Sequence, residues 1–141
     1  MSRVSIDEIA TAIIEQLRQD GRRSYAAIGK AVGLSEAAVR QRVQRLIDTD
    51  VMKVVAVTDP KALGLLRRAT LGIRVDGVIE PVATKLGDVP EVDTVVITAG
   101  SFDLLVDVAC RDDEHLLALL SRTIRKIPGV NTTEAFVHLH D

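Results

Sequence analysis

Long polar side chains concentrate between residues 40 and 45, and their types suit nucleic-acid recognition. Glutamine can make two hydrogen bonds to an adenine edge in the major groove, and arginine binds phosphate oxygens. If the residues that follow Ser35, up to Thr49, form a helix, with about 100° between successive residues, one arc is apolar and must face a core. That arc holds Val39, Val43, Leu46 and Ile47. The opposite arc holds Ala37, Ala38, Gln41, Gln44 and Arg45, with Arg40 and Arg42 near its margins.

The outward arc predicts a helix that enters the major groove of DNA. Gln41 lies near the middle of the arc, so we expect it to read a base edge, helped by Gln44. Ala37 and Ala38 keep the start of the helix slim enough to approach bases or a thymine methyl group. The phosphate contacts, which set the register, are assigned to Arg40, Arg42 and Arg45.

The residues before this helix carry the signals of a helix-turn-helix. Ser24 is a suitable N-cap for a first helix, Gly33 can end it in the left-handed conformation, and Ser35 can cap the second helix at once. Gly29 allows two helices to cross closely, and Val39 is placed to pack back on the first helix. The predicted DNA contacts are Ser24, Ser35, Ala37, Ala38, Arg40, Gln41, Arg42, Gln44 and Arg45. The alternative is a solvated polar face on an ordinary helical hairpin.

The flanking segments complete a small N-terminal domain. Apolar residues at helical spacing predict a first helix over residues 5–19, with Ser5 as its cap and residues 20–21 as its end. It should pack behind the helix-turn-helix and complete a three-helix core. Residues 51–57 are rich in valine and predict a wing or linker strand, which residues 58–60 break. Residues 61–66 should form a short turn or a single helical turn.

The second half of the chain combines predicted strands with predicted helices. Strands are predicted over residues 69–75, 92–98, 102–109 and 132–139, and helices over residues 81–86 and 112–127. The order β-α-β-β-α-β is that of a ferredoxin-like fold, with both helices on one face of the sheet. The other face would be free to pair with another copy. The predicted fold class is therefore α+β, with residues 1–50 as a winged helix-turn-helix, 51–68 as a wing and linker, and 69–141 as a ferredoxin-like domain.

Composition narrows the class of protein. The chain has 141 residues, of which 47% are hydrophobic and 2% aromatic, so a stacking platform for single-stranded nucleic acid is not expected. The lone Cys110 excludes an internal disulfide and a cysteine-based zinc site, and it suits a reducing cytoplasm. Neither a secretory leader nor an apolar run long enough to cross a bilayer is evident, so we expect a cytoplasmic protein.

The charge distribution bears on DNA binding. The net charge is −2, but residues 1–60 hold nine Lys and Arg against eight Asp and Glu, while residues 61–141 hold nine against twelve. A weakly charged monomer binds DNA poorly by itself. Dimerisation would double the phosphate contacts and match a two-fold DNA site.

Other candidates for chemistry are weaker. His138 and His140 lie on one face of a strand, as metal ligands can, but no third ligand of convincing geometry accompanies them. Cys110 and His115 resemble a nucleophile and base only superficially, because no activated third partner is evident. Neither a metal site nor catalysis is expected, and no cofactor motif is present.

Three stretches together carry a family resemblance: DGRRSYAAIGKAVGLSEAAVRQRVQRL, then TDPKALG, then TAGSFDLLVDVACRD. In this order they closely resemble the leucine-responsive regulatory protein (Lrp/AsnC) family of bacterial and archaeal transcription regulators, over essentially the whole chain. The resemblance implies a DNA-binding domain followed by a ligand-sensing, oligomerising domain. It also implies dimers paired through their sheets, further assembly into octamers or similar rings, and an amino acid or related metabolite as effector between dimers.

The resemblance places the effector near Gly100, where this chain departs from the family. Ser101 and Phe102 replace the more usual acidic and tyrosine pair; elsewhere, Ala10 replaces an acidic residue and Asp50 replaces a glycine. Gly100 lets backbone amides approach an α-carboxylate, and Asp103 could accept an α-ammonium. Neutral hydrogen bonds are assigned to Thr98, Ser101, Thr132 and Thr133. The alternative is that residues 100–101 are merely a hairpin turn and Asp103 an exposed strand residue.

These observations predict a sequence-specific transcription regulator that binds a palindromic site on double-stranded DNA as a homodimer and responds to a small molecule. Two alternatives remain: a small-molecule-binding adaptor that acts on a partner protein without touching DNA, and a small enzyme. The sequence leaves the effector, the operator, the direction of regulation and the oligomer size beyond a dimer open.

Overall fold

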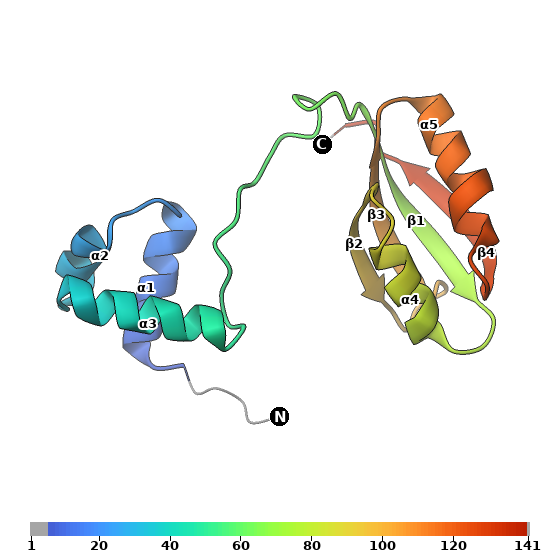
Figure 1. Cartoon of the computed structure of the whole chain (residues 1–141). Coiled ribbons are helices and arrows are strands. Elements are labelled where there is room, and N and C mark those ends of the chain that lie inside the picture. Colours follow the sequence, from blue (N-terminus) through green and yellow to red (C-terminus); the bar gives the residue numbers. More distant parts are fainter. Residues whose placement is uncertain (1–5, 141) are drawn as a thin grey trace. The chain divides into compact units, whose positions relative to one another are not determined.

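The computed structural model describes residues 6–140. The chain divides into two compact units at the boundary between Val57 and Thr58, and each unit has its own hydrophobic core. The first unit is helical, and the second contains the sheet (Figure 1).

Three helices form the first unit: α1 (Glu8–Gln19), α2 (Tyr25–Val32) and α3 (Glu36–Asp48). The predicted cap of α1 was wrong in position: Asp7 caps this helix, with its side chain accepting from the Ala10 amide, and Ser5 lies outside the described residues. The caps of the other two helices are confirmed as Ser24 and Ser35.

The three-helix core is built from the buried side chains Ile13, Leu17, Ile28, Val39 and Val43. Val39 is fully buried, as its spacing from Gly33 predicts. Ile47, which was expected in the core-facing arc of α3, is 36% exposed, because it lies at the edge of that arc near the end of the helix. Asp50 stands where the resembled family usually has a glycine. It adopts a left-handed φ of 57°, a conformation that aspartate tolerates better than most residues.

Residues 52–59 form no strand, so the prediction of a strand over residues 51–57 is wrong for the single chain. Met52 packs against the three-helix core, but Val55 and Val57 are 71% and 94% exposed. A strand requires a hydrogen-bonded neighbour, and none lies beside this segment within the part of the chain that the structure describes. High β-propensity by itself therefore leaves the segment extended and unpaired.

The second unit is a four-stranded antiparallel sheet in the order β2-β3-β1-β4, with β1 (Arg67–Val75), β2 (Val92–Ile97), β3 (Leu104–Cys110) and β4 (Val130–Val137). Helices α4 (Ile79–Gly87) and α5 (Asp113–Ala118) lie over one face of the sheet (Figure 1). Their apolar side chains pack against alternate residues of the two central strands, such as Leu71, Ile73 and Val106. The predicted β-α-β-β-α-β order is confirmed.

Several element boundaries differ from the prediction. β1 begins two residues earlier than expected, α4 begins two residues earlier and ends one residue later, and β4 both begins and ends two residues earlier. Two other differences change the kind of structure. The helix expected over residues 112–127 is regular only in α5, then continues as a π-helical turn at Leu119–Thr123 and a 3-10 turn at Ile124–Lys126. The strand expected from residue 102 begins at Leu104, because residues 98–103 form a loop held by hydrogen bonds between Thr98 and Asp103 and between Asp103 and Ile73.

The sheet face opposite the helices carries exposed apolar side chains. Val96, Leu105 and Phe136 are 47%, 37% and 46% exposed, and the strand register places them on this same face. Gly72 lies at its centre, covered by the ring of Phe102. We call this surface, defined by Gly72, Val96, Leu105 and Phe136, the open sheet face.

Candidate DNA interface and effector site

The corner between α2 and α3 is set by two serine caps and one left-handed glycine. Ser24 and Ser35 each accept a hydrogen bond from the amide three residues ahead, both at 3.1 Å. Gly33 has a φ of 78°, and its amide donates to the Gly29 carbonyl at 2.8 Å. Gly29 is buried against the Leu34 carbonyl, where a Cβ would not fit. This geometry is that of a helix-turn-helix and presents α3 as its second helix.

The predicted contact residues of α3 lie on its outward side. Ala37, Arg40, Gln41, Gln44 and Arg45 are exposed, whereas Ala38 and Arg42 are half-buried. Two of the polar side chains are bonded within the helix itself, Arg40 to Glu36 at 3.4 Å and Gln44 to Asp48 at 2.8 Å. The guanidinium of Arg40 also lies 5.0 Å from the centre of the Tyr25 ring.

Arg42 is bonded to a different helix. Its Nη1 donates to both carboxylate oxygens of Asp7, at 3.0 and 2.8 Å, so α3 is joined to the N-cap residue of α1. The pKa of Asp7 lies below its ordinary value of 3.8. The hydrogen bond from Arg42 is the largest cause, and the hydrogen bond from the Ala10 amide is the second. The carboxylate therefore stays ionised throughout the neutral range.

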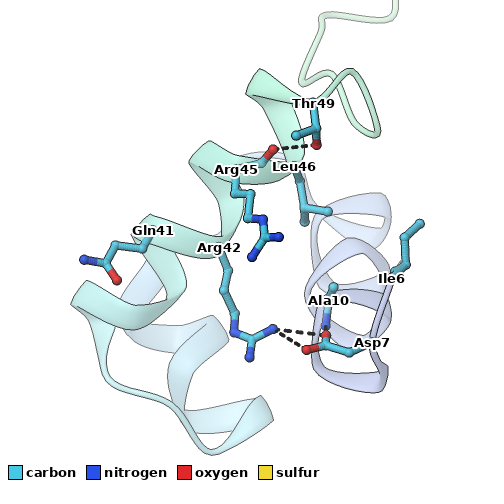
Figure 2. A pocket seen from close by; sticks show the side chains of 8 residues that line it. All are labelled: Ile6, Asp7, Ala10, Gln41, Arg42, Arg45, Leu46 and Thr49. Carbon is cyan, nitrogen blue, oxygen red and sulfur yellow. Dashed lines mark hydrogen bonds and ion pairs between the residues drawn. The ribbon is translucent and has the colours of Figure 1, made fainter. Parts of the chain in front are cut away.

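Gln41 and Arg45 remain available. Across residues 6–140 the structure gives neither side chain a hydrogen-bond or ion-pair partner, and the two are one helical turn apart on α3. Figure 2 shows Gln41 pointing away from Asp7, and Arg45 directed toward the space between α3 and α1. That space is a pocket of about 310 Å³ lined by Ile6, Asp7, Ala10, Gln41, Arg42, Arg45, Leu46 and Thr49.

The predicted effector residues lie at one end of the sheet but in two groups. Thr98, Gly100, Ser101 and Asp103 belong to the loop between β2 and β3, whereas Thr132 and Thr133 lie on β4, and β1 runs between the two groups. Gly100, Ser101 and Thr132 are exposed. Asp103 is a half-buried loop residue rather than an exposed strand residue, and its Oδ2 accepts from the Val75 amide at 2.8 Å.

Hydrogen bonds within the loop limit what these side chains can offer. The Thr98 hydroxyl donates to the Phe102 carbonyl, so it is already used. The ring of Phe102 covers Gly72, contacts Phe136 edge-on at 6.0 Å and lies 5.8 Å from the guanidinium of Arg74. The free polar groups of the loop are therefore those around Gly100 and Ser101, and one oxygen of Asp103.

Of the other candidate residues, His115 has hydrogen-bond partners and Cys110 is buried. His115 accepts from the Arg111 amide through Nδ1, so its Nε2 carries the hydrogen that it donates to Glu91 at 3.0 Å. Burial raises the pKa of the Cys110 thiol, which disfavours the thiolate that a nucleophile requires. In the described residues, no group of three or more His, Cys, Asp or Glu side chains is placed to hold a metal ion.

The sequence reasoning missed the acidic partners of the polar side chains on α3. The four-residue spacings of Glu36 with Arg40 and of Gln44 with Asp48 are visible in the sequence and could have indicated both pairs. Asp7 lies 35 residues from Arg42, and no local signal connects them.

Two family models match the chain, one for each unit. The AsnC-type helix-turn-helix domain matches residues 6–47, and the Lrp/AsnC ligand binding domain matches residues 68–141. Neither unit contains, within residues 6–140, a helix that is both long and apolar enough to cross a membrane.

Curated relatives match along nearly the full chain. The HTH-type transcriptional regulator FL11 of Pyrococcus horikoshii is 34% identical over 139 residues, which cover 97% of this chain and 91% of that protein. The proline dehydrogenase transcriptional activator of Rhizobium radiobacter is 30% identical over 137 residues, covering 94% of this chain and 88% of that protein.

Solved structures agree with these matches. AsnC of E. coli superposes with a TM-score of 0.85 at 25% identity, covering 98% of this chain and 95% of that one. The regulator NMB0573 of Neisseria meningitidis, solved as an L-Met complex, shares the fold with a TM-score of 0.86 at 20% identity, covering 97% and 92%. The relatives are regulators of transcription rather than enzymes. The chain therefore belongs to the Lrp/AsnC family of DNA-binding transcription regulators.

Proposed function

We propose that the helix-turn-helix places α3 in the major groove, where Gln41 reads a base edge and Arg45 binds a phosphate. The observation that carries this proposal is a pair of exposed side chains one turn apart on α3 that, within residues 6–140, have no hydrogen-bond or ion-pair partner. The ion pair of Arg40 with Glu36 joins two exposed side chains, 65% and 58% exposed, so it is weak. The Arg40 guanidinium can therefore leave Glu36 and bind a phosphate. A regulator of this kind acts on the chromosome, so we place it in the cytoplasm.

We propose that a second copy covers the open sheet face. The exposed apolar side chains of Val96, Leu105 and Phe136 would be removed from water by a symmetric partner. Such a dimer presents two copies of α3 and would match a palindromic operator with half-sites about one helical turn, or a multiple, apart. Further assembly into an octamer or another ring is an expectation from the family.

We propose that the second unit binds an amino acid or a related metabolite near the loop of Gly100. The match to a ligand-binding domain and the L-Met complex of a structural neighbour support this class of effector. Amides near Gly100 and Ser101 would bind the α-carboxylate, and the free carboxylate oxygen of Asp103 would accept from the α-ammonium. Thr132 and Thr133 belong to the proposed site only if the assembly brings β4 of one copy near this loop of another. Effector binding would then favour one assembly state and change DNA occupancy.

DNA selection from random duplexes, followed by fluorescence anisotropy, tests the DNA-binding proposal. We expect Gln41→Ala to change the preferred base at one position of each half-site, and Arg45→Ala to weaken binding to all sequences. Arg18→Ala, which removes the same charge from α1, serves as the control for Arg45. If neither substitution on α3 alters binding to any duplex, α3 is not the recognition helix.

Isothermal titration of the assembled protein with the common amino acids tests the effector proposal. Binding that Ser101→Pro abolishes, because proline removes the backbone amide at that position, would support the loop as the carboxylate site. Circular dichroism would confirm that the variant is folded. If no amino acid binds at millimolar concentration, this class of effector is wrong.

A further inference from the structure

The guanidinium of Arg42 is held at one edge only. Both of its hydrogen bonds to Asp7 come from Nη1. Within the described part of the chain, Nε and Nη2 have no partner, and Figure 2 shows these two nitrogens on the side of the guanidinium away from Asp7. Nε and Nη2 form a fork that matches two oxygens of a phosphate.

The carboxylate that holds Arg42 is itself fixed. Asp7 caps α1, and its Oδ1 accepts from the Ala10 amide at 2.7 Å while also accepting from Arg42. Arg42 projects from the middle of α3, so both ends of the pair belong to helices of the same core. The side chain of Asp7 is 56% exposed and that of Arg42 is 35% exposed, so the pair lies at a surface that DNA can reach.

Arg42 lies beside the proposed contacts. It lines the same pocket as Gln41 and Arg45, and all three project from the same helix. A long arginine side chain that is free in solution loses rotamer entropy when it binds a phosphate. An arginine already held in one rotamer loses less, so its phosphate contact is stronger for the same geometry.

We propose that Asp7 is a positioning residue for DNA binding: it orients Arg42 so that the Nε and Nη2 edge meets a phosphate beside the major groove. Asp7 does not touch DNA, and it acts only through Arg42. This inference rests on the proposed function of α3. It assigns to the first helix a role in DNA affinity in addition to its packing role.

The test uses the full-length protein and a labelled duplex of about three helical turns, roughly 30 base pairs, obtained by selection with the wild-type chain. Asp7→Asn keeps an N-cap but removes the charge that holds Arg42, and Asp7→Ser keeps a cap that is too short to reach the guanidinium. Glu8→Gln is the matched control, because Glu8 is the exposed neighbour on α1 and the charge change is the same. Tyr25 fluorescence and circular dichroism confirm that each variant is folded.

We expect both Asp7 variants to bind the duplex about two- to tenfold more weakly than Glu8→Gln, the range for ordering one long side chain. Arg42→Ala should reduce the slope of log K against log salt by about 0.9 for each bound copy of α3, as the loss of one phosphate contact requires. When each is combined with Arg42→Ala, Asp7→Asn and Glu8→Gln should bind the duplex with the same affinity. A purely structural role of Asp7 would persist in the Arg42→Ala background.

Three results would overturn the inference while leaving the proposed DNA-binding function intact. They are Asp7 variants that bind as tightly as Glu8→Gln, an unchanged salt slope in Arg42→Ala, and an effect of Asp7→Asn that survives the loss of Arg42. A wild-type chain that binds no selected duplex would overturn the proposed function, and the role of Asp7 with it.

Discussion

Replacing Gly29 by alanine tests how closely the corner of the helix-turn-helix must approach α2. A Cβ built on Gly29 would overlap the Leu34 carbonyl oxygen, and it would also lie 3.5 Å from the Ser35 carbonyl carbon. The obstacle is backbone, not the end of a flexible side chain. Relief therefore requires residues 33–35 to move away from α2, and α3 starts at the end of this corner.

Two opposing contributions set the size of the effect. Alanine is favoured over glycine inside a helix by about 1 kcal/mol. Overpacking a closed site costs about 1–3 kcal/mol, and the upper half of that range applies because the clash is with backbone. We therefore expect Gly29→Ala to lower the free energy of unfolding of the first unit by about 1–2 kcal/mol, net of the helix propensity.

Tyr25 makes this change measurable in the first unit alone. It is the only tyrosine of a chain that has no tryptophan, and it packs against the three-helix core. Urea unfolding followed by tyrosine fluorescence therefore reports on this unit. Gly87→Ala is the control, because a Cβ on Gly87, the last residue of α4, meets nothing within 4 Å. This control should leave the tyrosine transition where it is.

An unchanged or higher urea midpoint in Gly29→Ala would refute the reasoning. It would mean that the corner can shift at no cost, and so that Gly29 does not set the distance between α2 and the corner. A lowered midpoint with unchanged DNA affinity would show that the corner contributes to stability without orienting α3.

Two further predictions concern the second unit. The hydrogen bond from His115 holds the pKa of Glu91 below its ordinary value of 4.5. The ionised Glu91 therefore contributes its full stability above pH 4.5, and this contribution is lost as the pH falls through the lower pKa of the folded state. Glu91→Gln should therefore flatten the acid limb of thermal stability, whereas Glu80→Gln should not, and identical acid limbs in both variants would contradict the assignment. If the proposed dimer forms through the open sheet face, Leu105→Asp should convert it into a monomer in light scattering, because the substitution places a charge on that face. Leu117→Asp, at a 64% exposed site on α5, should leave the dimer intact, and a dimer that survives Leu105→Asp would place the interface elsewhere.

Most of the helix-turn-helix could be predicted because its signals are local. Ser24, Gly33 and Ser35 act on amides and φ angles within three or four residues, so their roles can be read from spacing. The outward face of α3 follows from helical periodicity in the same way. The order of strands and helices in the second unit was likewise predictable, because apolar periodicity and the glycine and proline breaks are properties of the chain itself.

The partners of the polar side chains depended on tertiary structure. Arg42 had the same appearance in the sequence as Arg45, yet packing of α1 against α3 brings Asp7 into hydrogen bonds with Arg42, whereas Arg45 acts on that carboxylate only through its charge. Residues 51–57 had the composition of a strand, but a strand exists only where a neighbour supplies the hydrogen bonds, and this unit supplies none among the described residues. Periodicity determined which side chains face outward, whereas contacts between distant residues decided which of them remain free to bind.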